Sequence, residues 1–109
     1  MTTKFNSIDE AKGFAAYQLG IELGEMILTP DLHAGGIEMT LLDDSDTSDE
    51  MKKAIQKRYD AQVGFTVLKK VKSTKCNEFE IKTIKVVIGP FRDGYDCYLL
   101  SENGMGFRI

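Results

Sequence analysis

The residues best suited to chemistry are four lysines that fall within seven positions, in the stretch KKVKSTK from 69 to 75. Lysine ammonium groups neutralise phosphates, and aromatic rings that alternate with them stack on unpaired bases. Ten basic residues lie between positions 52 and 85, with three acidic ones. A direct DNA-binding or RNA-binding protein is therefore one hypothesis, with these candidate residues: Lys69, Lys70, Lys72 and Lys75.

The same lysines also have a structural interpretation. If the chain turns through Ser73 to Asn77, a hairpin forms in which Lys72 lies opposite Glu78 and Lys70 opposite Glu80. Such cross-strand ion pairs hold the register of two strands, and lysines protect exposed strand edges from aggregation. This register predicts that the lysines stabilise the hairpin rather than bind a ligand.

In that register the aromatic rings of the two strands, Phe65 and Phe79, point to the opposite face, into the core. The formal net charge of the chain is −3, and it contains only three arginines. Phosphate binding needs a positive field that is not neutralised, and arginine is the favoured reader of bases. We therefore rank the structural interpretation above nucleic-acid binding.

A second charged cluster, the acidic segment, lies within DDSDTSDE at 43–50. Its acidic residues are Asp43, Asp44, Asp46, Asp49 and Glu50. An EF-hand is excluded because the sixth position from Asp44 is Asp49, where glycine is required, and the twelfth is Ile55, where glutamate binds calcium. Thr47 and Glu50 form a capping box for a following helix. The acidic segment is therefore either a helix start or a surface that meets a basic partner.

The sequence contains few residues in patterns typical of catalytic sites. The single histidine, His33, follows Asp31 in a loop with Gly35–Gly36, and no serine or cysteine motif accompanies it. Two ligands do not make a metal site, and neither a Walker loop nor a dinucleotide motif is present. We expect no enzyme, no metal and no cofactor; a small-ligand-binding protein or an enzyme with a site near His33 stays as a further alternative.

The two cysteines and the absence of an apolar run of about 18 residues indicate a cytoplasmic protein without a disulfide framework or membrane span. Cys97 is expected to be buried. Cys76, beside Lys75, is expected to be an inert loop thiol, with redox sensing as the alternative.

Charge is divided along the chain. Residues 1–50 hold eleven acidic and two basic side chains, whereas residues 51–109 hold six acidic and twelve basic ones. Such asymmetry steers the approach of oppositely charged partners.

The pattern of apolar residues predicts the elements that position these groups. A capping box of Ser7 and Glu10 opens a helix expected to run to about Leu28, a short strand follows over 37–42, and a second helix follows the acidic segment. The segment from 63 onward alternates as strands. Asn103–Gly104 predicts a two-residue hairpin loop that sets Leu100 opposite Phe107.

These elements make one α+β domain over residues 1–109, in which two helices accompany a mainly antiparallel sheet of four to five strands that ends in a C-terminal β-meander. A helix should pack on one face of the sheet. In 79–88 the apolar phase changes near Thr83, which indicates either a bulge or a strand buried on both faces.

The leading functional hypothesis is a small non-enzymatic protein that binds a protein partner through the acidic segment. By doing so it would act as a phage-type inhibitor or as a nucleic-acid mimic. Homo-oligomers are a further alternative, because the short strand ending at Ile109 leaves an edge open to pairing.

Overall fold

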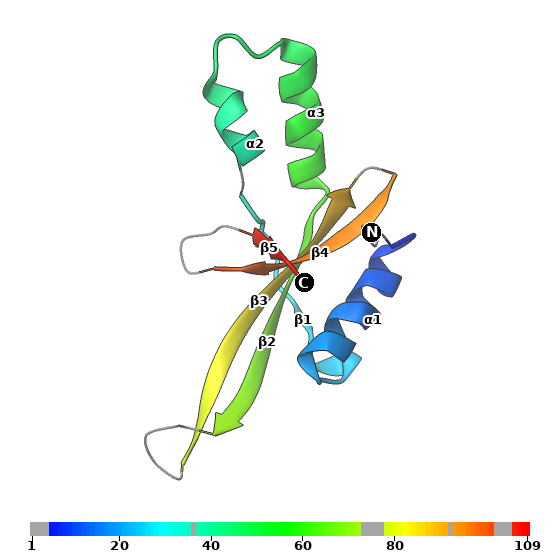
Figure 1. The fold of residues 1–109 in the computed structure, drawn as a ribbon, viewed down its shortest axis with the longest axis vertical. Coiled ribbons are helices and arrows are strands. Elements are labelled where there is room, and N and C mark those ends of the chain that lie inside the picture. The colour runs from blue at the N-terminus through cyan, green and yellow to red at the C-terminus, as the bar shows by residue number, and fades with distance from the viewer. Residues whose placement is uncertain (1–4, 36, 73–77, 92, 102–105) are drawn as a thin grey trace.

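The computed structural model describes residues 5–35, 37–72, 78–91, 93–101 and 106–109. Figure 1 shows an antiparallel sheet with one helix against one face, and two projections that extend from it in opposite directions. The strands follow chain order in the sheet: β1 (Ile27–Leu28), β2 (Val63–Lys72), β3 (Phe79–Phe91), β4 (Gly94–Leu100) and β5 (Gly106–Arg108). The α+β prediction with a C-terminal meander is confirmed.

Helix α1 (Ile8–Leu19) covers one face of the sheet. The hydroxyl of Ser7 accepts the Glu10 N–H at 3.1 Å and starts the helix, as predicted. Three alanines on its inner side, Ala11, Ala15 and Ala16, are buried. Their small side chains let the helix approach the strands closely.

The prediction that this helix continues to Leu28 is wrong. Gly20 adopts the left-handed conformation, at φ 67°, and donates its N–H to carbonyls of the last turn. The chain then passes through the 3₁₀ turn η1 (Leu23–Glu25) into β1. The apolar residues after Gly20 continue a helical spacing, but the glycine has already ended the helix.

The expected strand over 37–42 is also wrong, because this segment forms α2 (Ile37–Thr40) and the 3₁₀ turn η2 (Leu41–Asp43). Helix α3 (Asp49–Asp60) follows, as predicted. The predicted capping box of Thr47 and Glu50 is wrong, because the N-cap is Ser48, whose hydroxyl accepts the Met51 N–H at 3.2 Å. Together, α2, η2 and α3 form a helical arm that projects from the sheet (Figure 1).

The segment that links β1 to the arm crosses the sheet face opposite α1, and glycines make room for it. A Cβ atom added to Gly64 of β2 would lie 2.5 Å from the Cβ of Leu32, and one added to Gly106 of β5 would lie 3.0 Å from the Cβ of Ala34. No larger residue fits there without displacing the crossing segment.

Gln62 fastens the base of the arm. Its side-chain amide accepts the Ala34 N–H at 2.8 Å and donates to the Ala34 carbonyl at 3.3 Å, so it satisfies both backbone groups of Ala34, as a paired strand residue would. The same side chain lies over Gly89 of β3. The rings of His33 and Tyr59 stack at 4.7 Å between centroids.

The centre of β3 is buried on both faces. Val86, Val87 and Ile88 have no exposed surface, because α1 lies on one side and the crossing segment on the other. Thr83 pairs with Leu68 in an unbroken register, so the strand has no bulge there. Of the two predicted explanations for the phase change, burial on both faces is correct.

The β4–β5 register differs from the expected one by one residue. Phe107 lies opposite Leu99 rather than Leu100. The Asn103–Gly104 loop, on which that expectation rested, lies outside the described residues.

Candidate functional site: the projecting hairpin

The β2–β3 hairpin extends beyond the other strands of the sheet and beyond α1 (Figure 1). Its register is one residue away from the predicted one: Lys72 lies opposite Phe79, and Lys70 lies opposite Ile81. The predicted lysine–glutamate pairs across the strands are therefore wrong. The predicted turn itself, Ser73–Asn77, lies outside the described residues.

A shift of one residue exchanges the faces of one strand relative to the other, because side chains alternate along a strand. Glu80 joins Lys69 and Val71 on the face that α1 covers further along, whereas Phe79 joins Lys70 on the opposite face. The prediction that Phe65 points into the core is confirmed. For Phe79 it is wrong.

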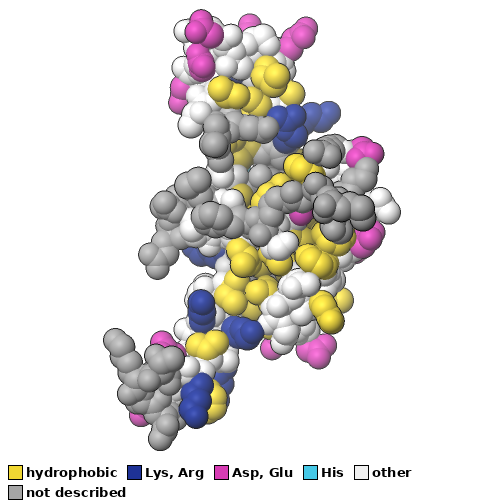
Figure 2. Space-filling model, viewed as in Figure 1, with side chains coloured by type: hydrophobic (Ala, Val, Ile, Leu, Met, Phe, Trp, Pro, Cys, Tyr) yellow, Lys and Arg dark blue, Asp and Glu magenta, His cyan; other side chains and the backbone are white. Residues whose placement is uncertain are grey.

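The face opposite α1 carries large apolar side chains and lysines together, and we call it the lysine–apolar face. Register and alternation assign it these residues: Ile27, Leu68, Lys70, Lys72, Phe79, Ile81 and Lys85. Its four apolar side chains are more than half exposed, from 54% for Ile27 and Leu68 to 71% for Ile81. The three lysines are exposed as well. Figure 2 shows lysine and apolar atoms next to one another on the hairpin.

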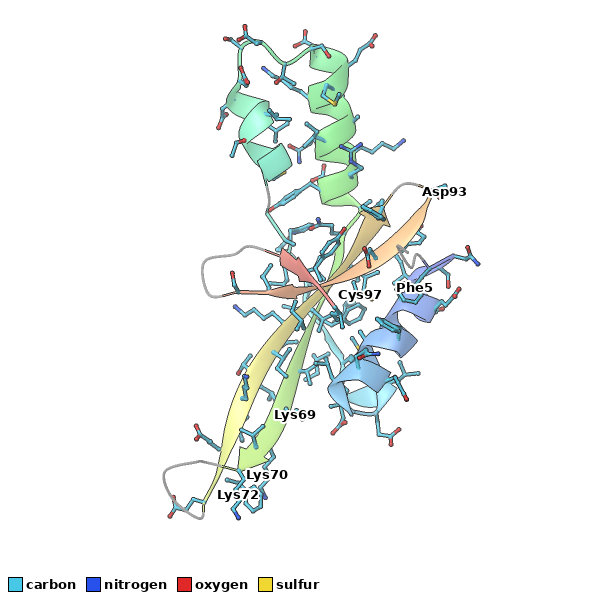
Figure 3. All side chains as sticks on the ribbon, viewed as in Figure 1. Phe5, Lys69, Lys70, Lys72, Asp93 and Cys97 are labelled. Carbon is cyan, nitrogen blue, oxygen red and sulfur yellow. The ribbon has the colours of Figure 1, made fainter. Side chains whose placement is uncertain are left out.

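The four candidate lysines do not form one group. Lys69, labelled in Figure 3, uses its Nζ to donate to the carbonyl of Leu19 at 2.7 Å, at the end of α1. Lys70 places its Nζ 4.6 Å from the centre of the Phe79 ring. Lys72 lies further along the hairpin, and Lys75 lies outside the described residues.

These contacts separate a structural lysine from surface ones. Lys69 is half-buried and satisfies a helix C-terminus, where a cation is favoured. The ammonium of Lys70 lies at a distance where the negative face of an aromatic ring attracts it. Lys70 and Lys72 therefore belong to the surface available to a partner, together with the exposed apolar groups.

The acidic segment lies at the opposite end of the molecule, on the helical arm. The described residues extend 55 Å along their long axis, and Figure 2 shows acidic side chains at the end of the arm and lysines on the hairpin. All five acidic residues are exposed. The carboxylate of Asp44 accepts the Asp46 N–H at 2.9 Å, and Asp49 and Glu50 occupy the first turn of α3. Part of this cluster thus serves local structure.

The other candidate residues have structural contacts. His33 is stacked on Tyr59 at the base of the arm. The thiol of Cys97 is buried, as predicted, and donates to the Ala11 carbonyl at 3.0 Å (Figure 3). Burial, assisted by the charge of Asp96, raises the pKa of this thiol to about 12, so it stays protonated. Cys76 lies outside the described residues.

Across the described ranges, no three acidic, histidine or cysteine side chains gather as metal ligands. None of the helices in that part of the chain has the length and apolarity that crossing a bilayer requires.

Comparison with known proteins gives no match: no protein-family model, curated protein or solved structure is significantly similar to this chain.

Sequence reasoning missed the apolar half of this face. The signal was Leu68, which is out of phase with Val67 and Val71 in a strand whose odd positions are the apolar ones. A large apolar residue on the polar phase of a strand indicates an apolar side chain that faces solvent, as Leu68 does at 54% exposure.

Proposed function

We propose that this protein is a non-enzymatic binding protein that recognises a protein partner through the lysine–apolar face of its β2–β3 hairpin. The observation that carries the proposal is the exposure of Leu68, Phe79 and Ile81 on one face of the projecting hairpin, with Ile27 of the neighbouring strand β1 exposed on the same face. Single exposed apolar residues are normal, whereas a contiguous group of large ones marks an interaction surface.

The composition of the face favours a protein over a nucleic acid. Three of its four apolar side chains are aliphatic, and aliphatic groups pack against protein side chains but offer bases no ring on which to stack. The lysines around them favour a partner that carries negative charge, because opposite charges increase the rate of association.

The acidic segment remains a proposal of its own, as the contact for a basic partner, in the manner of a nucleic-acid mimic or a phage-type inhibitor. Its support is the exposure of all five acidic side chains at the end of the helical arm, far from the hairpin. Because two of these residues sit in the first turn of α3, neutralising variants need a stability measurement beside the binding one.

A capture experiment with matched surface variants tests the proposed function. The binding variant is Leu68→Ser/Phe79→Ser/Ile81→Ser, which removes three exposed side chains. The control variant is Tyr17→Ser/Leu23→Ser, which removes side chains that are 81% and 50% exposed outside this face. Capture from a lysate of the source cells should be lost with the first variant and retained with the second. Equal capture by both variants would refute the proposal.

Direct binding of single-stranded DNA or RNA is the second candidate, and one observation favours it: Phe79 lies on the same face as Lys70 and Lys72, not in the core. The test is fluorescence anisotropy of labelled oligonucleotides at about 50 and 200 mM salt. Binding that weakens steeply with salt, and that disappears in Lys70→Gln/Lys72→Gln/Lys85→Gln but not in Lys69→Gln, would establish this function in place of protein binding.

A further inference from the structure

The outer edge of β2 is open along most of the hairpin. Strand β1 is two residues long and pairs only with Phe65 and Thr66. From Val67 to Lys72, no strand of the described part of the chain lies beside β2 on that side. A strand edge of this length presents backbone N–H and C=O groups that can pair with another chain.

The register shows which backbone groups face outward. The N–H of Thr29 donates to the carbonyl of Gly64 at 2.8 Å on this edge, and hydrogen-bonding positions recur at every second residue of an antiparallel strand. The outward backbone groups along the open edge are therefore those of Leu68, Lys70 and Lys72. The side chains of these three residues lie on the lysine–apolar face.

We propose that this edge accepts an extended, acidic segment of a partner protein, which adds to the sheet as a further strand next to β2. This inference rests on the proposed protein-binding function and specifies how the partner is held. Backbone hydrogen bonds would supply affinity, and side chains at alternate positions would supply specificity, as in other cases of strand addition.

Charge complementarity identifies the occupant. Acidic residues of an incoming strand would lie opposite Lys70 and Lys72, where opposite charges stabilise a cross-strand pair. A second copy of this chain is disfavoured. Antiparallel pairing of two β2 edges sets lysine against lysine whether the register is centred on Lys69, on Lys70 or on Val71.

The probe is a synthetic peptide of residues 66–72 in which Lys69, Lys70 and Lys72 are replaced by glutamate. The control is the unchanged 66–72 peptide, which has the same length and apolar residues but the opposite charge. Each peptide is titrated into the isotopically labelled protein while amide resonances are followed by NMR. We expect the acidic peptide to bind with a Kd of about 1 mM or tighter, and to shift the amides of Leu68, Lys70 and Lys72.

Two protein variants separate backbone pairing from side-chain contact. Leu68→Pro removes one outward N–H at an edge position where proline is tolerated, whereas Leu68→Ala removes most of the same side chain and keeps the N–H. Strand addition predicts at least a tenfold weaker acidic-peptide affinity for the proline variant than for the alanine variant.

Each outcome decides the inference. Equal affinities of the proline and alanine variants would overturn strand addition, while the capture experiment would still decide the proposed function separately. Absence of peptide binding, or equal binding of both peptides, would overturn it too. Dimerisation of the wild-type protein through β2 would make a second copy the occupant, and oligonucleotide binding that displaces the peptide would make nucleic acid the occupant.

Discussion

Replacement of Gly64 by alanine tests the crossing of the sheet by the β1–α2 segment. The added Cβ would lie 2.5 Å from the Cβ, 2.6 Å from the carbonyl oxygen and 2.9 Å from the Cγ of Leu32. A flexible side chain can move away, but a carbonyl oxygen moves only with its backbone. We therefore expect a cost near the upper end of the usual range for overpacking, about 2 to 3 kcal/mol of unfolding free energy.

For a chain of this length, about 1 kcal/mol corresponds to roughly 4 °C in Tm, so the Gly64→Ala variant should melt about 10 °C below the wild type. The matched control is Gly13→Ala in α1, where an added Cβ meets nothing within 4 Å. Alanine is the better helix former by about 1 kcal/mol, so this variant should be more stable than the wild type.

Urea unfolding followed by circular dichroism, together with thermal melts, measures both effects. The opposite signs of the two glycine-to-alanine changes are the important result. If Gly64→Ala unfolds within about 0.5 kcal/mol of the wild type, the crossing segment does not lie against β2 as described, and the explanation of this glycine is refuted.

Three further predictions concern the lysines, the helix cap and the buried thiol. Lys69→Met should lower the unfolding free energy by about 1 kcal/mol, because a helix carbonyl loses its donor, whereas Lys72→Met should change it by less than about 0.5 kcal/mol; equal effects would contradict the separation of these lysines. Ser48→Ala should cost about 1 kcal/mol and Thr47→Ala much less, as measured by urea unfolding; the reverse order would restore Thr47 as the cap. Burial raises the pKa of the Cys97 thiol from about 9 in the unfolded chain to about 12 in the folded protein. The contribution of the protonated thiol to the unfolding free energy is therefore complete below pH 9 and decreases as the pH rises from 9 toward 12, because the unfolded chain releases the proton first. Unfolding measured from pH 8 to 10.5 should therefore show a steeper loss of stability for the wild type than for Cys97→Ala, and parallel curves would refute the shift.

Local signals predicted much of the fold. The N-cap of α1, the helix after the acidic segment, the strand from Val63 to Lys72 and the burial of Cys97 all follow from caps and apolar periodicity within a few residues. Burial of β3 on both faces was one of two explanations that the sequence allowed. These features depend on near neighbours, which are visible in the chain.

The site was predictable only in part. The sequence identified a lysine hairpin, but the assignment of each side chain to a face depended on a register that no local pattern specifies. With Ser73 to Asn77 as the turn, the predicted register was one residue away from the observed one, and this difference moved Phe79 from the core to the surface. Because of that error, the sequence did not predict the apolar part of the lysine–apolar face.

Composition and periodicity by themselves determined the class of fold, the two charged clusters and the poor supply of catalytic groups, because each depends on residue types and short spacings. The tertiary structure alone decided that Lys69 belongs to α1 while Lys70 belongs to the surface, that Gly64 and Gly106 face a crossing segment, and that the clusters lie at opposite ends. The physical reason is that strand register and close backbone approach depend on contacts between segments far apart in the chain.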